Sequence, residues 1–299
     1  TSEGHLLLNG KIIDEFGRVS LEFDGYQLRR FDALGKSHLA SSALVLSRDD
    51  VGVDGLTNIV IPRRRPQATE VEISVCASGI NFKDVLFALG MLPLPDPEYQ
   101  FGLECAGVVS RIGYDVTEFQ PGQRVMCMTK AGHSSFVLQE QRRCAHIPEG
   151  MSMTEAAGLP VAFFTAYSSL VHTARLSQGE TVLIHAATGG VGLASIQVAT
   201  LIGASIIATA GTDEKRQFLR SMGIQHVFST RDQSFHAGVM AATAGKGVNV
   251  VLNSLSGELL HAGLQCLATG GRFVEIGRRD ILADTPIGMR TLEKGISVH

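Results

Sequence analysis

The sequence predicts an α/β protein in which a doubly wound parallel sheet follows an antiparallel β domain. From residue 181 onward, short apolar runs alternate with stretches whose apolar residues recur at helical spacing. This is the pattern of parallel strands that helices cover on both faces. A glycine-rich turn joins the first of these runs to the stretch after it. Before residue 150, short alternating stretches separated by turn residues are instead typical of antiparallel strands.

The stretch over residues 181–211 is the centre of the predicted parallel sheet. Its apolar runs are rich in β-branched residues, as expected for strands buried on both faces. Together with the helix between them they form a βαβ unit of the size that dinucleotide-binding folds use. We expect a strand at 181–186, a helix at 193–202 and a strand at 204–210.

The turn in this unit predicts binding of a pyrophosphate. A side chain at Gly189 or Gly190 would hold the backbone away from the anion, whereas free N–H groups at a helix start face it. The pattern has alanine, Ala187, where the commoner fingerprint has its first glycine. The alternative is a tight turn with a structural role only. The predicted cofactor-binding residues of the turn are Thr188, Gly189, Gly190, Val191 and Gly192.

The end of the second strand favours NADPH over NADH. NAD-binding folds usually place Asp or Glu about 20 residues after the glycines, to hold the ribose 2′-hydroxyl. This chain has Gly211 there, and the cations Lys215 and Arg231 follow. Asp213 is more simply an N-cap of the next helix than a ribose ligand. For Lys215 and Arg231 the alternative is a solvated surface charge.

Length and composition limit the remaining possibilities. A chain of 299 residues can form two domains, and 44% hydrophobic with 18% charged residues is ordinary for a globular protein. A net charge of −3 gives no reason to expect nucleic acid or a membrane surface. Neither an apolar run of about 20 residues nor a signal peptide pattern occurs, so we expect a cytoplasmic location. Five cysteines without a CxxC pair predict buried free thiols.

The chain is expected to divide into three segments. Residues 1–47 read as an upstream linker or β segment with no assigned chemistry, 48–157 as a substrate domain and 158–299 as the NADPH-binding domain. A short helix is expected at 81–89, and a longer one at 159–172. The basic run Arg63 to Arg65 could grip a phosphate, but a solvated loop is the simpler interpretation. Residues 295–299 read as a new strand, so we expect a piece of a longer protein.

Five motifs occur in a fixed order. They are GINFKDVL at 79–86, FGLECAGVV at 101–109, AATGGVG at 186–192, GVNVVLNSLSGE at 247–258 and GRFVEIGRRDI at 271–281. Together they resemble the enoyl reductase domain of reducing polyketide synthases and animal-type fatty acid synthases, within the medium-chain dehydrogenase/reductase superfamily. The similarity is greatest to highly reducing synthases of the fungal kind.

The resemblance implies a GroES-like β domain, a Rossmann domain and NADPH as the cofactor. It also implies hydride transfer to the β-carbon of an α,β-unsaturated thioester, followed by protonation of the α-carbon. The implied partners are an acyl carrier protein with a phosphopantetheine-tethered chain, other synthase domains and, by analogy, a second copy of the chain. The family works without metal. Zinc-dependent relatives have Cys and His where this chain has Asn81 and Leu103, and neither can hold zinc; His133 and His146 read as core or surface residues.

The resemblance also assigns roles to single residues. Asn81 is the candidate donor to the thioester carbonyl, the alternative being an Asx turn or helix cap after Gly79. Arg278 replaces the lysine that many members carry, and arginine is a poor proton donor, so it is expected to position or stabilise. Leu92 stands where many bacterial members have tyrosine, so protonation by tyrosine is not assumed, and water is one candidate proton source. The residues expected near the nicotinamide are Thr165, Asn253, Ser254, Leu255 and Gly277, each with a strand-end or capping role as the alternative.

Two other functions stay open at this point. One is a catalytically silent domain kept for structure or docking, which the change to Arg278 permits. The other is a free-standing zinc-independent quinone or enone reductase, which shares the glycine turn but is disfavoured by the LNSLSGE and FVEIGRRDI motifs.

Overall fold

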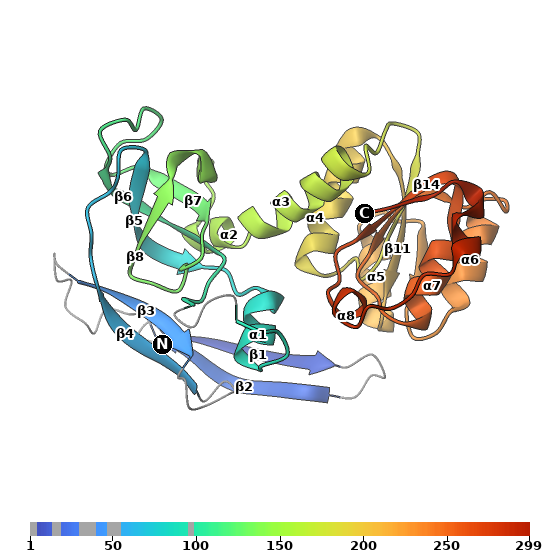
Figure 1. The fold of residues 1–299 in the computed structure, drawn as a ribbon, viewed down its shortest axis with the longest axis horizontal. Coiled ribbons are helices and arrows are strands. Elements are labelled where there is room, and N and C mark those ends of the chain that lie inside the picture. The colour runs from blue at the N-terminus through green and yellow to red at the C-terminus, as the bar shows by residue number, and fades with distance from the viewer. Residues whose placement is uncertain (1–4, 14–18, 30–39, 47–54, 95–98) are drawn as a thin grey trace. The chain divides into compact units, whose positions relative to one another are not determined.

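The computed structural model describes residues 5–13, 19–29, 40–46, 55–94 and 99–299, and its contacts divide the chain into two compact units (Figure 1). The first unit comprises Thr1–Asn9 and Phe23–Val161, and the second comprises Gly10–Glu22 and Ala162–His299. Part of the upstream segment expected at 1–47 therefore lies outside the described residues. None of the described helices is long and apolar enough to cross a membrane.

The first unit is built on an antiparallel sheet of five strands. The strand order is β8-β5-β6-β7-β9, and Val71, Ile73 and Val109 on its inner face are buried in one apolar cluster. The strands are β5 (Glu70–Ser78), β6 (Glu104–Ile112), β7 (Arg124–Met128), β8 (Phe136–Glu140) and β9 (Cys144–His146). A smaller sheet of this unit pairs β3 (Ala40–Leu46) with β4 (Leu56–Pro62), and a further sheet pairs β1 (His5–Ile13) with β2 (Val19–Arg29), whose residues divide between the two units.

Short helices connect the strands of this unit. α1 (Phe82–Ala88) follows β5, η3 (Gln141–Arg143) joins β8 to β9, and α2 (Met153–Ala157) follows β9. Ser152 and Glu155 form a capping box at the start of α2, each side chain bonding to the other residue's backbone N–H.

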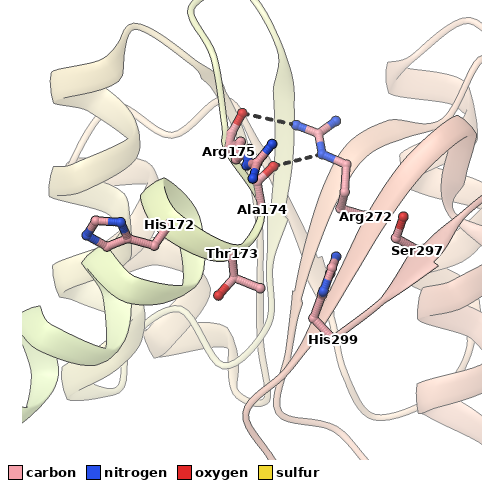
Figure 2. A pocket seen from close by; sticks show the side chains of 7 residues that line it. All are labelled: His172, Thr173, Ala174, Arg175, Arg272, Ser297 and His299. Carbon is pink, nitrogen blue, oxygen red and sulfur yellow. Dashed lines mark hydrogen bonds between the residues drawn. The ribbon is translucent and has the colours of Figure 1, made fainter.

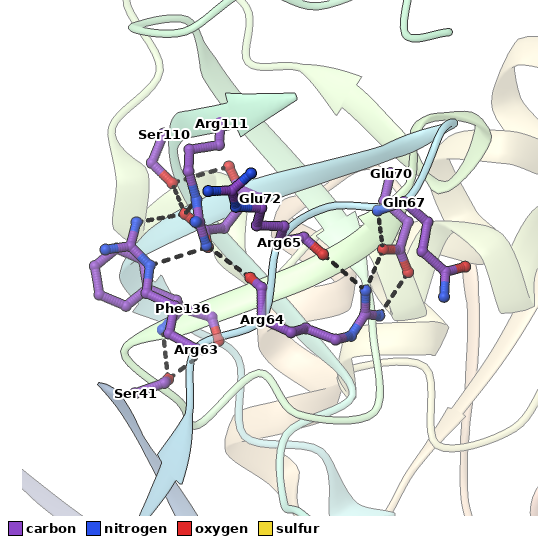
Figure 3. A network of polar contacts seen from close by, with 10 residues as sticks. All are labelled: Ser41, Arg63, Arg64, Arg65, Gln67, Glu70, Glu72, Ser110, Arg111 and Phe136. Carbon is purple, nitrogen blue, oxygen red and sulfur yellow. Dashed lines mark hydrogen bonds and ion pairs between the residues drawn. The ribbon is translucent and has the colours of Figure 1, made fainter. Parts of the chain in front are cut away.

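A buried carboxylate fixes the link between β4 and β5. Glu72 has no exposed side-chain surface, and it accepts hydrogen bonds from Arg63, Arg111 and Ser110 (Figure 3). The neighbouring Arg64 forms a two-fold ion pair with Glu70. The interpretation of the basic run as a solvated loop is therefore wrong for Arg63, whose side chain is 10% exposed.

The cysteines are free thiols, as predicted. Cys105 and Cys127 are opposite each other on β6 and β7, with their Sγ atoms 3.6 Å apart. Cys266 is also buried, but Cys76 is exposed and Cys144 is half-buried. The expectation that all five thiols are buried is therefore wrong for Cys76.

The second unit is a six-stranded parallel sheet with the order β12-β11-β10-β13-β14-β15. Val182 and Ile184 pack in one apolar cluster and Leu183, between them, packs in another, so both faces are covered (Figure 1). This confirms the doubly wound sheet. The strands are β10 (Thr181–Ile184), β11 (Ser205–Ala210), β12 (His226–Ser229), β13 (Val248–Asn253), β14 (Leu267–Glu275) and β15 (Ser297–Val298).

Helices alternate with these strands along the chain. One apolar cluster takes residues from α4 and α5 and the other from α6 and α7, which assigns the helix pairs to opposite faces of the sheet. The helices are α3 (Pro160–Tyr167), the π-helix η4 (Ser168–Thr173), α4 (Gly190–Ile202), α5 (Asp213–Ser221), α6 (Ser234–Ala242), α7 (Glu258–Gln265), α8 (Arg279–Leu282) and the 3-10 helix η5 (Met289–Lys294).

The boundaries differ from the expected ones where the backbone departs from a regular period. The helix expected at 159–172 is α3 followed by the π-helix η4. β14 begins four residues before the expected residue 271, because Leu267 already pairs with Val248. The pairing is irregular between Leu267 and Arg272, where Gly270 adopts a φ of 71°. At the chain's end, only Ser297–Val298 of the expected strand pairs with β14.

Candidate functional site

The glycine turn between β10 and α4 has the predicted place in the fold. Gly189 is the N-cap residue of α4, and Gly190 is its first helical residue. A Cβ on Gly190 would meet nothing nearer than 3.9 Å, so the space in front of this backbone is open. A Cβ on Gly192 would lie 2.6 Å from Cα of Ala187, so this glycine lets the helix pack against the turn. Thr188 and Val191, between these glycines, are half-buried.

The end of β11 carries a cation where an NAD site would have a carboxylate. Nε of Arg231 donates to the carbonyl of Gly211 over 3.0 Å, and the arginine is exposed. Lys215 is exposed in the first turn of α5. The N-cap of α5 is Thr212, whose Oγ1 accepts the backbone N–H of Lys215, so the expected cap at Asp213 is wrong.

A further arginine, Arg216, lies near the end of β11 and was not identified from the sequence. Arg216 donates to the carbonyl of Ala210 over 2.9 Å and pairs with Asp213 one turn earlier. Its position three residues after Asp213 predicts the ion pair but not the contact with the strand end.

The loop after β13 is organised by Asn253. This side chain is fully buried, and its Nδ2 donates to the carbonyl of Leu255 over 2.8 Å and to the carboxylate of Glu275. Glu275 also accepts the N–H of Gly277, and burial raises the pKa of its carboxyl. These contacts hold together the carboxyl ends of β13 and β14, where ligands bind in such sheets. Ser254 projects into solvent.

The remaining predicted residues of this unit lie in three places. Thr165 is half-buried in α3, and Leu255 packs at the edge of an apolar cluster. Arg278 is the exposed N-cap residue of α8, and its guanidinium forms no hydrogen bond or ion pair with the residues that the structure describes. For every residue that the sequence assigns to cofactor binding, contact with the cofactor stays a prediction.

Asn81, in the first unit, occupies the N-cap position of α1 without capping it. Its Nδ2 instead donates to Oε1 of Glu104 over 3.0 Å, so the interpretation of its side chain as a helix cap is wrong. The other carboxylate oxygen of Glu104 accepts the backbone N–H of Val161 over 2.8 Å. Glu104 is 3% exposed, and this burial raises the pKa of its carboxyl. A Cβ on Gly79 would lie 2.4 Å from Oε1 of Glu104, so only glycine fits beside this carboxylate.

A second polar group lies next to this pair. Oγ of Ser78 and Nδ1 of His133 are 2.7 Å apart. Asp84 accepts hydrogen bonds from the hydroxyl of Tyr99 and the N–H of Gly102, while its Oδ2 is buried without a partner among the described residues. Burial raises the pKa of Asp84 and lowers that of His133.

The position of Leu92 is purely apolar. Its side chain is buried in a cluster with Phe87 and Phe101. It offers no proton donor.

A cavity of about 630 Å³ lies elsewhere in the second unit, near the edge strand β15 (Figure 2). Arg272, which lines the cavity, forms two ion-pair hydrogen bonds with Glu180 and donates to the carbonyl of Ala174. None of the residues predicted from the sequence lines it. The lining residues are His172, Thr173, Ala174, Arg175, Arg272, Ser297 and His299.

Comparison with known proteins assigns both units. The family sequence model of the alcohol dehydrogenase GroES-like domain matches residues 67–178. The family sequence model of the zinc-binding dehydrogenases matches residues 190–298. The two folds and the glycine turn thus define a medium-chain dehydrogenase/reductase, a class of oxidoreductases that use a nicotinamide cofactor.

Within this class the chain belongs to the enoyl reductase domains of polyketide synthases. The crystal structure of CurK enoyl reductase superposes with a TM-score of 0.78 at 41% identity, covering 86% of this chain and 80% of that one. A phenolphthiocerol/phthiocerol polyketide synthase of Mycobacterium tuberculosis is 41% identical over 91% of the chain, and highly reducing polyketide synthase ZEA2 of Gibberella zeae is 45% identical over 75%. The chain spans only 12% and 10% of these two synthases.

The residues do not fit the zinc ion for which the zinc-binding dehydrogenases are named. The amide of Asn81 is bound to Glu104, and Leu103 has no ligand atom. The described part of the chain contains no group of three or more His, Cys, Asp or Glu residues that could hold a metal ion. No step of the reaction is therefore assigned to a metal.

Proposed function

We propose that this chain is an NADPH-dependent enoyl reductase module acting on the α,β-unsaturated thioester of a polyketide or fatty acyl chain bound to an acyl carrier protein. The single observation that carries the choice of cofactor is the position of Arg231 against Gly211 at the end of β11. A guanidinium there suits a 2′-phosphate, and the first acidic residue, Asp213, is already paired with Arg216.

The residues fit a nicotinamide dinucleotide. The open space before Gly190 leaves room for a pyrophosphate at the N-terminus of α4, whose free N–H groups favour an anion. Lys215 and Arg231 would hold the 2′-phosphate. Thr165, Ser254, Leu255 and Gly277 would hold the nicotinamide end, with Asn253 shaping their loop. When bound, the cofactor supplies the hydride that the β-carbon receives.

Asn81 would act on the other reactant. One N–H of its amide is used by Glu104, which fixes the side chain and leaves the second N–H for the thioester carbonyl oxygen. As hydride reaches the β-carbon, negative charge moves to that oxygen, and a fixed donor stabilises the enolate. Loss of one such donor typically slows turnover by about 100- to 1,000-fold.

Protonation of the α-carbon would then come from water. Arginine is a poor proton donor, so the exposed guanidinium of Arg278 would orient a carbonyl or phosphate. Leu92 cannot donate a proton at all.

The partners follow from the family. The relatives are multidomain synthases, so the carrier protein and other synthase domains would be partners, and β15 at the sheet edge could pair with a second copy. Location in the cytoplasm stays a prediction from the sequence.

One observation favours a second candidate, the catalytically silent domain. Arg278 replaces the family's lysine and has no partner among the described residues that would hold it in a catalytic geometry. A silent domain would still bind NADPH, since the glycine turn and Arg231 are intact.

The test measures NADPH oxidation by the full-length protein on crotonyl-pantetheine, with NADH and a quinone as parallel controls. Thioester-dependent turnover with NADPH, weak with NADH and absent with the quinone, is the expected result. Quinone-dependent turnover would indicate the free-standing reductase function instead. No turnover by a folded protein that binds NADPH would overturn the proposal in favour of the silent domain.

A further inference from the structure

The pair formed by Ser78 and His133 has no role in the function proposed so far. Ser78 ends β5, three residues before Asn81, and His133 follows β7 in the chain. Their polar atoms, Oγ and Nδ1, are 2.7 Å apart although 55 residues separate them in sequence. Because Ser78 is close in sequence to Asn81, the candidate substrate donor, its half-buried partner His133 is a candidate second polar group for the same substrate.

The backbone fixes where His133 lies. Its backbone N–H donates to the carbonyl oxygen of Phe101 over 2.9 Å. The backbone N–H of Gly132 donates to the carbonyl oxygen of Gly102 over 2.8 Å. A Cβ on Gly102 would lie 2.4 Å from N of His133, and one on Gly132 would lie 2.4 Å from the carbonyl oxygen of Glu104. Glycines therefore bring His133 against the segment that carries Glu104, the partner of Asn81.

The hydrogen bond with Ser78 engages Nδ1 and leaves Nε2 as the other polar atom of the imidazole. Either atom of this pair can donate, and we take the arrangement in which the hydroxyl of Ser78 donates to Nδ1 of His133. In a neutral ring, the other nitrogen then carries the N–H. Nε2 has no hydrogen-bond partner in the described part of the chain, yet it is not among the buried atoms left without one. In this arrangement, Nε2–H is therefore the donor that a ligand can meet.

The surroundings keep the ring neutral. Burial lowers the pKa of His133, and the charge of Asp84, the acidic group that acts on it, only partly opposes this effect. A neutral imidazole can donate a hydrogen bond to a developing oxyanion without itself losing a proton.

We propose that Nε2–H of His133 is a second hydrogen-bond donor to the thioester carbonyl oxygen, and that Ser78 is the positioning residue that holds its tautomer. The inference rests on the proposed function. Asn81 and His133 would share the oxyanion, so each would stabilise the enolate and neither would be consumed in the reaction. No bond to His133 forms or breaks, and the α-proton still comes from water.

The experiment uses the full-length protein with His133→Phe, His133→Gln and Ser78→Ala, and His146→Gln as the control. His146 is an exposed histidine of the same unit that packs on Phe119. The first measurement is kcat on crotonyl-pantetheine. The second is the absorption of cinnamoyl-pantetheine bound together with oxidised NADP, because a donor on the carbonyl shifts this absorption to longer wavelength without any turnover.

We expect His133→Phe to lower kcat by about 100- to 1,000-fold and to abolish the red shift, with NADPH affinity unchanged. His133→Gln keeps an N–H donor and should restore part of both signals. Ser78→Ala leaves the ring but frees its tautomer, so an intermediate loss is expected, and His146→Gln should match the wild type.

The failures can be told apart. A wild type that does not reduce the thioester overturns the proposed function and this inference with it. An active wild type whose kcat and red shift survive His133→Phe overturns this inference alone. If His133→Phe does not fold, the red shift in His133→Gln and Ser78→Ala decides, and an unchanged shift in both overturns the role of His133.

Discussion

The carboxylate of Glu104 accepts a hydrogen bond from Nδ2 of Asn81 over 3.0 Å, although Asn81 stands where the helix α1 begins. An asparagine at this position normally caps the helix, which stabilises a protein by about 1 kcal/mol. Here the amide of Asn81 makes no capping hydrogen bond. It is held instead by a carboxylate that is 3% exposed and whose second oxygen is bound to the backbone of Val161. The arrangement fixes the amide in place at the expense of the cap.

Replacing Glu104 by Gln should therefore disturb Asn81. Asn81 and Val161 donate to different oxygens of Glu104, and glutamine keeps only one of these, so in the same position its NH₂ group would face one of the two donors. We expect the free energy of unfolding to fall by about 1 to 3 kcal/mol, and kcat on the enoyl thioester to fall as well. Urea denaturation and steady-state kinetics measure the two effects, with the exposed Glu149→Gln as the control. Wild-type kcat in Glu104→Gln would refute a positioning role for this carboxylate.

Arg231→Ala should weaken NADPH binding selectively. Loss of a charge-assisted hydrogen bond to the 2′-phosphate corresponds to about 1.5 to 3 kcal/mol, or roughly 10- to 100-fold in Kd. NADH lacks this phosphate, so its Kd should not change. Lys246→Ala is the matched control, because Lys246 is exposed just before β13, at the opposite ends of the strands from the glycine turn. Fluorescence titration gives both constants, and an equal loss for the two cofactors would contradict the assignment.

Local patterns were enough to predict most of the fold. The parallel strands are continuous apolar runs and the glycine turn is a contiguous motif, so β10, α4 and β11 are close to their expected places. The π-helix after α3 could not be predicted, since its sequence keeps a helical apolar period. The sheet order depends on pairing between distant segments, and it was not predicted from the sequence.

The site was predicted only where its chemistry is local. The glycines and Arg231 lie near strand ends, which a βαβ spacing defines, and their contacts with a cofactor stay predictions. Glu104 and Ser78 act on residues 23 and 55 positions away, and no short motif reports such contacts. The glycines beside Glu104 were the available signal, because Gly102 and Gly132 mark a close backbone approach.

The two glycines of the turn should respond differently to a side chain. Gly190→Val would add atoms to open space, so we expect unchanged stability but loss of NADPH affinity, as the side chain would fill the pyrophosphate position. Gly192→Ala would place a Cβ 2.6 Å from Cα of Ala187, which should lower the free energy of unfolding by about 1 to 3 kcal/mol. Thermal denaturation and NADPH titration of both variants test this division. It would be wrong if Gly190→Val bound NADPH like the wild type.

The buried ion-pair network of Glu72 should make stability depend on pH. Burial alone would raise the pKa of Glu72, but hydrogen bonds from Arg63, Arg111 and Ser110 outweigh it and lower the pKa to about 2. Because the folded pKa lies below the unfolded value of 4.5, the stabilising contribution is complete above about pH 4.5 and is lost as the pH falls toward 2. The shift corresponds to about 3 kcal/mol.

Glu72→Gln should lower the free energy of unfolding by about 3 to 5 kcal/mol near pH 7, since it leaves two arginines without their carboxylate. The side chain of Arg63 is only 10% exposed, so water cannot replace the lost partner there. Urea denaturation of both proteins between neutral pH and pH 2.5 gives the difference, which we expect to shrink below about pH 4.5 as Glu72 itself takes up a proton. The exposed Glu149→Gln should show no such difference. A gap between wild type and Glu72→Gln that stays constant down to the lowest pH would mean that the charge of Glu72 does not stabilise the unit.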